Sequence, residues 1–311
     1  MAGKATRASF GESLAELGQE FKNVVVLDAD LSKSTKSESF AKKFPERFFQ
    51  MGISEMNMIG VAAGLAFSGK VPFLCSFGCF LTGRFDTIRL SVGYSNANVR
   101  LVGTHAGIGI GEDGYSQMAL EDIGCMRTLP GMAVLQPADD IETKQMMQFL
   151  MKHQGPVYLR LTRQNLEPVN GADYKFQFGR GVELKSGKDA VVFATGGLTA
   201  HALNAAKQLE KEGMSVGVVN IHTIKPLDVE LVQKLSKQVK HVFTAEDHNI
   251  IGGLGSAVCE TLSSAGIGTR VTRLGVQDVY GESGSPEGLY EKHGLDAQGL
   301  ARSIKSNINA N

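Results

Sequence analysis

The sequence predicts an α/β protein with two doubly wound, mostly parallel sheet domains. Apolar runs of strand length alternate with segments of helical period along almost all of the 311 residues. The strand-length runs are continuously apolar rather than alternating, which is typical of parallel strands covered by helices on both faces. At about 150 residues per domain, the length also indicates two such units.

The first half alternates between the two kinds of segment from its start. Phe10, Leu14, Leu17 and Phe21 recur at helical spacing and predict the first helix. The strands predicted after it are 24–27, 71–76, 99–102, 133–136 and 157–161. The further predicted helices are 56–67, 85–94, 117–128 and 141–153.

A change of composition separates the two halves. Pro and Gly cluster between 164 and 188, so we predict a first domain over 1–165, a linker over 166–188 and a second domain over 189–311. The strands predicted in the second domain are 190–194, 216–221, 241–245 and 271–274. The helices predicted there are 200–211, 229–239 and 255–264.

Charge and cysteine content restrict the functional class. Lys plus Arg (32) equals Asp plus Glu (32), so we expect neither nucleic acid nor a membrane surface as a partner. The sequence also has no apolar run of about 18 residues. Four cysteines without paired metal-ligand spacing predict buried thiols in a reducing compartment, and we expect a cytoplasmic protein without metal ligands of its own.

Polar residues follow several of the predicted strands in the first half. In parallel α/β folds, ligands bind at the carboxyl ends of the strands, which meet at one edge of the sheet. The polar segments at these ends are 28–30, 52–55, 104–105 and 107–114. Arg160 and Arg163 follow a further strand, and we expect Arg160 to form a structural ion pair. The sequence therefore predicts one site at this edge.

Two features of this edge have more than one interpretation. Glu55 begins an apolar helix, where a carboxylate is either favoured by the helix dipole alone or shielded in an apolar pocket that lets it hold a proton near neutrality. The run from Gly109 to Gly114 matches the dinucleotide fingerprint G-x-G-x-x-G, but Glu112 and Asp113 would face a pyrophosphate. We do not favour a dinucleotide site for this reason.

Several longer runs resemble a known family. They are LDADLSKST (27–35), GISEMNM (52–58), VPFLCSFGCFLTGRFDTIR (71–89) and GTHAGIGIGEDGYSQMALED (103–122). Through these runs the chain resembles transketolase, in its pyrimidine-binding domain. The runs IHTIKPLD (221–228) and EDHNIIGGLG (246–255) resemble the C-terminal domain of the same family.

The resemblance covers only the second half of the usual transketolase, because the GDG motif of the family's N-terminal domain is not matched. It implies the C-terminal subunit of a split transketolase. An N-terminal partner subunit would hold the diphosphate of thiamine diphosphate with Mg²⁺ or Ca²⁺, in an α2β2 heterotetramer. The implied reaction is the reversible transfer of a glycolaldehyde unit from a ketose phosphate to an aldose phosphate, as in pentose phosphate metabolism.

The resemblance also implies which residues contact the cofactor. Glu55 matches the Glu that shares a proton with the aminopyrimidine ring, and Phe77 and Phe80 match aromatics that stack on that ring. Asp30 matches an Asp near the thiazolium, although an N-cap of the next helix is its alternative. Gln117 stands where many microbial members have a second His, as in the animal-type branch.

Five residues match the substrate ligands of the family. His105 matches the substrate histidine, which we count as catalytic together with Glu55, and Asp113 matches the aspartate that contacts sugar hydroxyls. Arg7, Ser34 and Arg163 match the ligands of the sugar phosphate, and an Arg fork suits a phosphate group.

Other functions remain open from the sequence. The β subunit of a 2-oxoacid dehydrogenase and a deoxyxylulose-phosphate synthase share a Glu in the context of Glu55, whereas His105 with Arg163 favours transketolase. A non-catalytic assembly or regulatory subunit is the alternative from another class. Glu246, Asp247 and His248 follow a predicted strand of the second domain, which otherwise lacks a convincing reactive set. Because the resemblance implies dimer contacts for this domain, we interpret the second domain as assembly surface.

Overall fold

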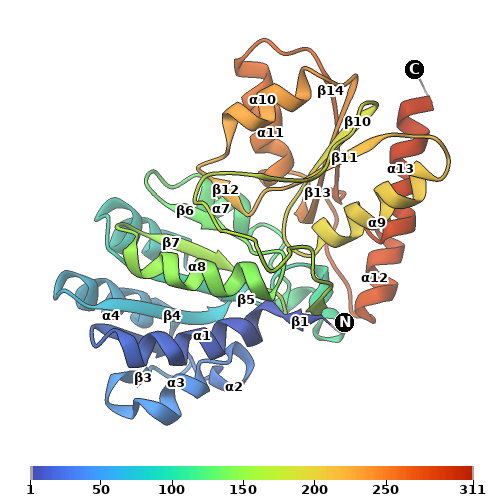
Figure 1. Cartoon of the computed structure of the whole chain (residues 1–311). Coiled ribbons are helices and arrows are strands. Elements are labelled where there is room, and N and C mark those ends of the chain that lie inside the picture. Colours follow the sequence, from blue (N-terminus) through green and yellow to red (C-terminus); the bar gives the residue numbers. More distant parts are fainter. Residues whose placement is uncertain (1–2, 310–311) are drawn as a thin grey trace.

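The computed structural model describes residues 3–309, which form two main sheets with helices on both faces (Figure 1). This arrangement confirms the predicted α/β class. The first sheet has seven strands in the order β12-β6-β7-β5-β4-β2-β3 and is parallel except for β12. Its strands are β2 (Val24–Asp28), β3 (Phe48–Gln50), β4 (Val71–Phe77), β5 (Arg100–Thr104), β6 (Ala133–Leu135), β7 (Val157–Arg160) and β12 (Thr223–Lys225).

Alternate residues of the first sheet face two different helical layers. Helices α1 (Thr6–Glu20) and α8 (Asp140–Lys152) pack on one face, where Phe10 and Met146 contact strand residues such as Phe73. The other face contacts α4 (Glu55–Phe67), the π-helix η2 (Ile88–Tyr94) and α7 (Asp122–Arg127). The short helices of this half are α2 (Ser32–Thr35), α3 (Glu38–Lys43), η1 (Pro45–Arg47), α5 (Gly78–Thr82), α6 (Phe85–Thr87), η3 (Ile108–Asp113) and η4 (Tyr115–Gln117).

The second sheet has five strands in the order β14-β13-β10-β11-β9. They are β9 (Val182–Lys185), β10 (Ala190–Ala194), β11 (Val216–Asn220), β13 (His241–Asn249) and β14 (Arg270–Val276), and only β9 is antiparallel. Helices α9 (Leu198–Glu210) and α13 (Ala297–Asn309) cover one face, and α10 (Val229–Ser236) and α11 (Leu254–Ser264) cover the other. Helix α12 (Pro286–Lys292) packs on η3 of the first half. Strands β1 (Lys4–Ala5) and β8 (Asn165–Leu166) form a separate small pair.

Two predicted helices differ from the structure. The predicted helix 117–128 is helical only from Asp122, because Ala119 forms a parallel bridge with Ala106 and accepts a hydrogen bond from the Gly107 amide at 3.0 Å. Met118, which precedes Ala119, is extended, so an α-helix cannot continue from Gln117 into α7. The predicted helix 85–94 divides into α6 and the π-helix η2.

The segment predicted as a linker, 166–188, packs closely on both halves. The side chain of Gln145 on α8 donates to the Tyr174 carbonyl at 2.7 Å and accepts from the Phe176 amide at 2.8 Å. The same segment contributes β9 to the second sheet. Strand β12, from the second half, completes the first sheet. The domain boundaries at 165 and 189 stay a prediction, because chain segments cross between the two units.

Candidate functional site

The candidate site lies at the carboxyl edge of the first sheet, where neighbouring parallel strands end together. Strand β4 pairs with β2 and β5, and Phe77 at the end of β4 lies opposite Thr104 at the end of β5. The residues that follow these strands therefore meet at one edge. We call residues 105–117, which follow β5, the site loop.

His105 opens the site loop in a left-handed conformation, with φ of 57°. Its ring is 2% exposed and stacks on Phe77, with ring centroids 3.8 Å apart. Phe77 in turn stacks on Phe80, with centroids 5.3 Å apart and the planes 8° from parallel. The structure thus brings together three of the predicted site residues as one stack of rings, of which Phe80 is the most exposed.

Hydrogen bonds fix the tautomer of His105. An arginine only donates, so the contact of 2.8 Å from Arg7 Nη1 makes His105 Nε2 an acceptor. The Nδ1 proton then faces the Thr104 hydroxyl at 2.8 Å, and that hydroxyl donates to the Ser76 carbonyl at 3.3 Å. His105 is therefore a neutral imidazole with a defined orientation.

The surroundings of His105 keep it neutral. The pKa of His105 is lowered to about 3, chiefly by burial and in addition by neighbouring cations. These cations are Arg7, Arg163 and Lys36. Lys36 was not predicted as a site residue, although it lies two residues after the predicted ligand Ser34. It adopts φ of 70° and packs against α1 at Gly11, one turn after Arg7.

Glu55 lies close to this stack. It is the first residue of α4, is 6% exposed, and its Oε1 accepts from the Ser76 hydroxyl at 3.5 Å. Ser76 immediately precedes Phe77 on β4, so the carboxylate and the stacked rings share one neighbourhood. Both interpretations of Glu55, a helix-start carboxylate and a carboxyl shielded from water, agree with this position.

Two of the predicted phosphate ligands, Arg7 and Ser34, are joined beside Nε2 of His105. Arg7 Nη1 also donates to the Ser34 carbonyl at 2.8 Å, so the main chain of Ser34 rather than its hydroxyl makes this contact. Arg163 Nη1 donates to the Ile110 carbonyl at 2.5 Å and lies 3.6 Å from Asp113 Oδ2. Burial and the charge of Arg163 lower the pKa of Arg7. The two guanidinium groups therefore lie close enough to repel each other.

Asp30 and Gln117 are the least connected of the predicted residues. Asp30 is exposed with φ of 65°, and its amide donates to Gln50 Oε1 at 2.7 Å. The N-cap alternative for Asp30 is wrong, because Leu31 holds that position in α2. Gln117 ends η4 half-buried, and its amide donates to the Gly114 carbonyl at 3.1 Å.

Asp28 lies in the predicted polar segment 28–30 but was assigned no role of its own, and it organises the segment that contains Asp30 and Ser34. Its carboxylate is fully buried and accepts from the Leu31 amide at 2.6 Å and from the hydroxyls of Thr35 and Ser37 at 2.8 and 2.9 Å. The signal in the sequence that could have identified this role is the position of Asp28 at the end of a buried strand.

The dinucleotide alternative is wrong. Gly109, Gly111 and Gly114 lie in and directly after the 3₁₀-helix η3, which leads into the short η4 rather than into an α-helix. A dinucleotide site needs the N-terminus of an α-helix at this point. The run folds instead as a compact turn packed on α12.

Arg160 forms the structural ion pair that the sequence predicts. It is fully buried, and its Nε donates to Asp122 Oδ2 at 2.7 Å. Tyr158 donates to the same oxygen at 2.7 Å. Asp122 sits at the start of α7, so this cluster ties α7 to the sheet beneath the site loop.

Glu246, Asp247 and His248 do not follow the strand but lie buried within β13. The interpretation of the second domain as assembly surface stays a prediction. Asp247 accepts from the Ile108 amide at 2.8 Å and therefore contacts the site loop. Glu246 accepts from the amides of Leu254 and Gly255 at 2.7 and 2.8 Å and caps α11. The strand is longer than predicted, and the second half packs here on the first.

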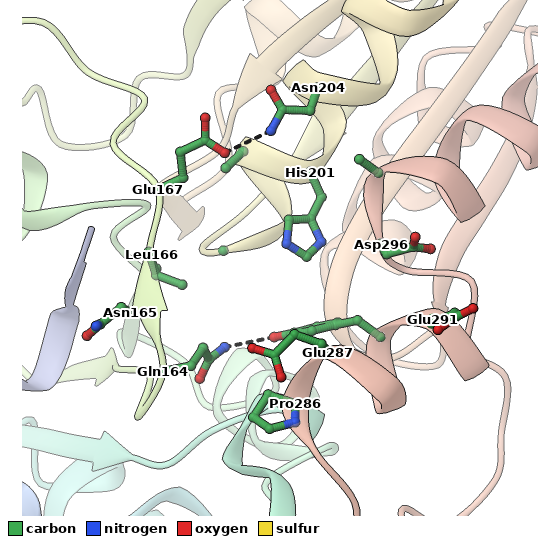
Figure 2. Close-up of a pocket in the computed structure, with 14 residues that line it drawn as sticks. Gln164, Asn165, Leu166, Glu167, His201, Asn204, Pro286, Glu287, Glu291 and Asp296 are labelled. Carbon is green, nitrogen blue, oxygen red and sulfur yellow. Dashed lines mark hydrogen bonds between the residues drawn. The ribbon is translucent and has the colours of Figure 1, made fainter. Parts of the chain in front are cut away.

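A cavity of about 640 Å³ lies beside the site, between residues 164–167, α9 and α12 (Figure 2). Its lining includes several carboxylates and His201, which points into the cavity. Glu167 accepts from Asn204 at 2.8 Å across the cavity. None of the predicted site residues lines it, and its nearest link to them is Gln164, the neighbour of Arg163.

Within residues 3–309, no group of three or more His, Cys, Asp or Glu side chains could hold a metal ion. No helix in the same range has the length and apolar character needed to cross a bilayer.

Family models match the chain in two parts. Residues 2–168 match the model described as transketolase, pyrimidine binding domain, and residues 179–300 match transketolase, C-terminal domain. A solved structure described as a split gene transketolase, in the form of an inactive β4 tetramer, is 47% identical with a TM-score of 0.91. The alignment covers 99% of each chain.

Curated relatives include proteins of similar length and a protein of which this chain spans about half. A protein of Methanocaldococcus jannaschii, provisionally named transketolase C-terminal section, is 45% identical over 97% of this chain and 95% of its own. A subunit of 6-deoxy-6-sulfo-D-fructose transketolase from Clostridium is 39% identical, over 95% and 92%. Human transketolase is 38% identical over 98% of this chain but only 49% of its own length.

Proposed function

This chain belongs to the transketolase family, and on that premise we propose that it is the C-terminal subunit of a thiamine-diphosphate-dependent transketolase made of two chains. The proposed reaction transfers a glycolaldehyde unit reversibly from a ketose phosphate to an aldose phosphate. The observation that carries the proposal is the cluster of Glu55 with the ring stack of Phe80, Phe77 and His105. The relatives of equal length support the assignment to one half of the enzyme.

The residues of the cluster fit the pyrimidine ring of the cofactor. When bound, thiamine diphosphate supplies a nucleophilic carbon for breaking and forming carbon–carbon bonds next to a carbonyl. The half-buried ring of Phe80, backed by the parallel ring of Phe77, offers a flat apolar surface for a planar heterocycle. The shielded carboxyl of Glu55 would hold or return a proton at a ring nitrogen. Asp30 and Gln117 would complete this side.

The group of cations near His105 fits an anionic sugar. Arg7 and Arg163 approach each other at the cost of mutual repulsion, and Lys36 adds a third positive charge. A phosphate group bound between them would relieve this repulsion and accept both guanidinium forks. Asp113 would accept from sugar hydroxyls, and Ser34 would contact the phosphate. Neutral His105 would accept a hydrogen bond at Nε2 from a hydroxyl at the reacting end of the sugar, in place of the one from Arg7.

Pentose phosphate metabolism is the proposed setting. We call the three cations Arg7, Arg163 and Lys36 the clamp, because they would bind an anionic group. A sulfonate presents three terminal oxygens in a tetrahedral arrangement, as a phosphate ester does. The relative named for 6-deoxy-6-sulfo-D-fructose therefore agrees with a site that several anionic ketoses could enter.

The outward face of α4 offers a surface for the N-terminal partner, which would hold the diphosphate and its Mg²⁺ or Ca²⁺. Met56 and Phe67 are 54% and 65% exposed, and a Cβ added at Gly60 or Gly64 would meet no atom within 4 Å. Leu90 on the neighbouring η2 is also exposed. An open apolar face beside Glu55 suits a protein interface, and we assign it to the partner in an α2β2 heterotetramer.

The test of this function is Glu55→Gln in the complex with an N-terminal subunit, thiamine diphosphate and Mg²⁺. We expect ketol transfer to fall by about 10² or more, since proton transfer at the ring would be lost. The matched control is Glu20→Gln at the exposed end of α1, which should leave the rate unchanged. A Glu55→Gln complex with a rate near that of the unmodified protein would exclude the proposed role.

A further inference from the structure

We propose that the second half of the chain holds the site loop in its working conformation, with Asp247 as the positioning residue. This inference rests on the proposed function for its effect on substrate binding. It gives the C-terminal half a part in the substrate site itself.

Asp247 accepts hydrogen bonds from the site loop with both carboxylate oxygens. Oδ1 accepts from the Ile108 amide at 2.8 Å, and Oδ2 lies 3.4 Å from the Gly109 amide. The approach is so close that a Cβ at Gly107, whose φ is 87°, would lie 2.1 Å from Asp247 Oδ2. The turn after His105 is therefore shaped around a carboxylate from β13.

Apolar contacts hold the same loop. Ile108 and Ile110 are fully buried, in the hydrophobic cluster formed by β10, β13, α9 and α12 of the second half. Phe243 and Leu289 belong to this cluster. A loop that bears substrate ligands thus has its apolar side chains in the core of the other half.

Asp247 is also linked, through Tyr290, to the segment that carries Arg163. Tyr290 on α12 donates to Asp247 Oδ2 at 2.6 Å and accepts from Gln164 Nε2 at 2.7 Å, the hydrogen bond drawn at Gln164 in Figure 2. Arg163 itself donates to the Ile110 carbonyl. Asp247 and Tyr290 therefore fix the two segments that carry Arg163 and Asp113 relative to each other.

Asp247 acts through these contacts and not on the substrate. It is 3% exposed, and its main-chain carbonyl accepts from Arg160 Nη2 at 2.9 Å. Burial raises the pKa of Asp247, while Arg160, Tyr290 and the two loop amides oppose this shift. The carboxylate is thus surrounded by donors, and removal of its charge leaves the loop amides with a poorer acceptor.

The experiment compares Asp247→Asn with Glu246→Gln, its buried neighbour, which caps α11 instead of the site loop. In the complex with the N-terminal subunit, we expect Asp247→Asn to raise KM for phosphorylated ketoses by about tenfold, the effect of one lost hydrogen bond to a charged group. KM for hydroxypyruvate, which lacks a phosphate, should be unchanged. Glu246→Gln should lower Tm and leave both KM values unchanged.

A second experiment tests whether Asp247→Asn raises KM by displacing Arg163. In the Arg163→Ala background, Asp247→Asn should raise KM no further, because the residue that it positions is gone. Tyr290→Phe provides a milder variant that keeps the ring in place, and it should show the same pattern with a smaller increase. Equal increases of KM for phosphorylated and unphosphorylated substrates, or full additivity with Arg163→Ala, would overturn the proposal.

Hydrogen exchange of the chain alone separates this proposal from the proposed function. Asp247→Asn should speed amide exchange at residues 107–112, and Glu246→Gln should speed exchange at the start of α11 instead. Unchanged exchange in the site loop would refute the anchoring by Asp247. If the unmodified complex shows no ketol transfer, the proposed function fails, and exchange alone decides whether Asp247 holds the loop.

Discussion

At the scale of single residues, the centre of the site is a histidine that does not carry charge. His105 takes a left-handed conformation, stacks on Phe77 and accepts a hydrogen bond from Arg7. A proton on this ring would be buried beside three cations, so neutrality follows from the surroundings. The phosphate side of the site can therefore gather positive charge without a further charge on His105.

His105→Asn tests this ionisation through stability. With a folded pKa of about 3 against 6.5 in the unfolded chain, His105 contributes stability above pH 6.5 that is lost as pH falls toward 3. Asn tolerates the left-handed backbone and does not titrate. Between pH 7.5 and 5 the unmodified chain should lose about 2 kcal/mol of unfolding free energy relative to the variant. Denaturant titrations measure this, and a pH-independent difference would contradict it.

At the scale of elements, a glycine on α1 is tightly packed, whereas a glycine on α4 has open space beside it. A Cβ at Gly11 of α1 would lie 2.6 Å from the Lys36 carbonyl oxygen, so α1 touches the segment after α2 at this residue. That contact supports the bond from Arg7 to Ser34. Gly60 on α4 faces open space. The close packing of α1 therefore belongs to the site, whereas the bare face of α4 is left for assembly.

The pair Gly11→Ala and Gly60→Ala tests this contrast in the chain alone. Alanine favours a helix over glycine by about 1 kcal/mol, so Gly60→Ala should raise Tm. At Gly11 the clash should outweigh that gain and destabilise the fold by about 1–3 kcal/mol. Thermal unfolding of both variants gives the result, and an equal rise of Tm in both would contradict the packing described for α1.

Element prediction from the sequence was accurate where the apolar pattern alone decides the structure. Strand 190–194 and helix 56–67 agree with β10 and α4 to within a residue. The helix predicted from 117 was wrong in its first half, because pairing between Ala119 and Ala106 overrides local propensity. Strand β12 was not predicted, since its position depends on an edge of the first sheet far away in sequence.

At the scale of the whole molecule, both halves contribute to one site: the first half carries the site residues, and the second half contacts the site loop. The sequence predicted that Glu55 and His105 gather at one edge, because parallel strands end together, whereas Phe77 was predicted there only through the family resemblance. It could not predict the hydrogen bond from the Ile108 amide to Asp247, which joins residues 139 positions apart, one in η3 and the other in β13 of the second sheet. Nor could it predict which face of α4 stays bare, since only packing decides this.

The most direct test of the central claim is ketol transfer from xylulose 5-phosphate to ribose 5-phosphate, measured for this chain alone, for an N-terminal transketolase subunit alone and for the two mixed. Thiamine diphosphate and Mg²⁺ are present throughout. We expect no transfer by either chain alone and transfer by the mixture, which should elute as one complex. Full transfer by this chain alone, or none by a mixture that has formed the complex, would contradict it.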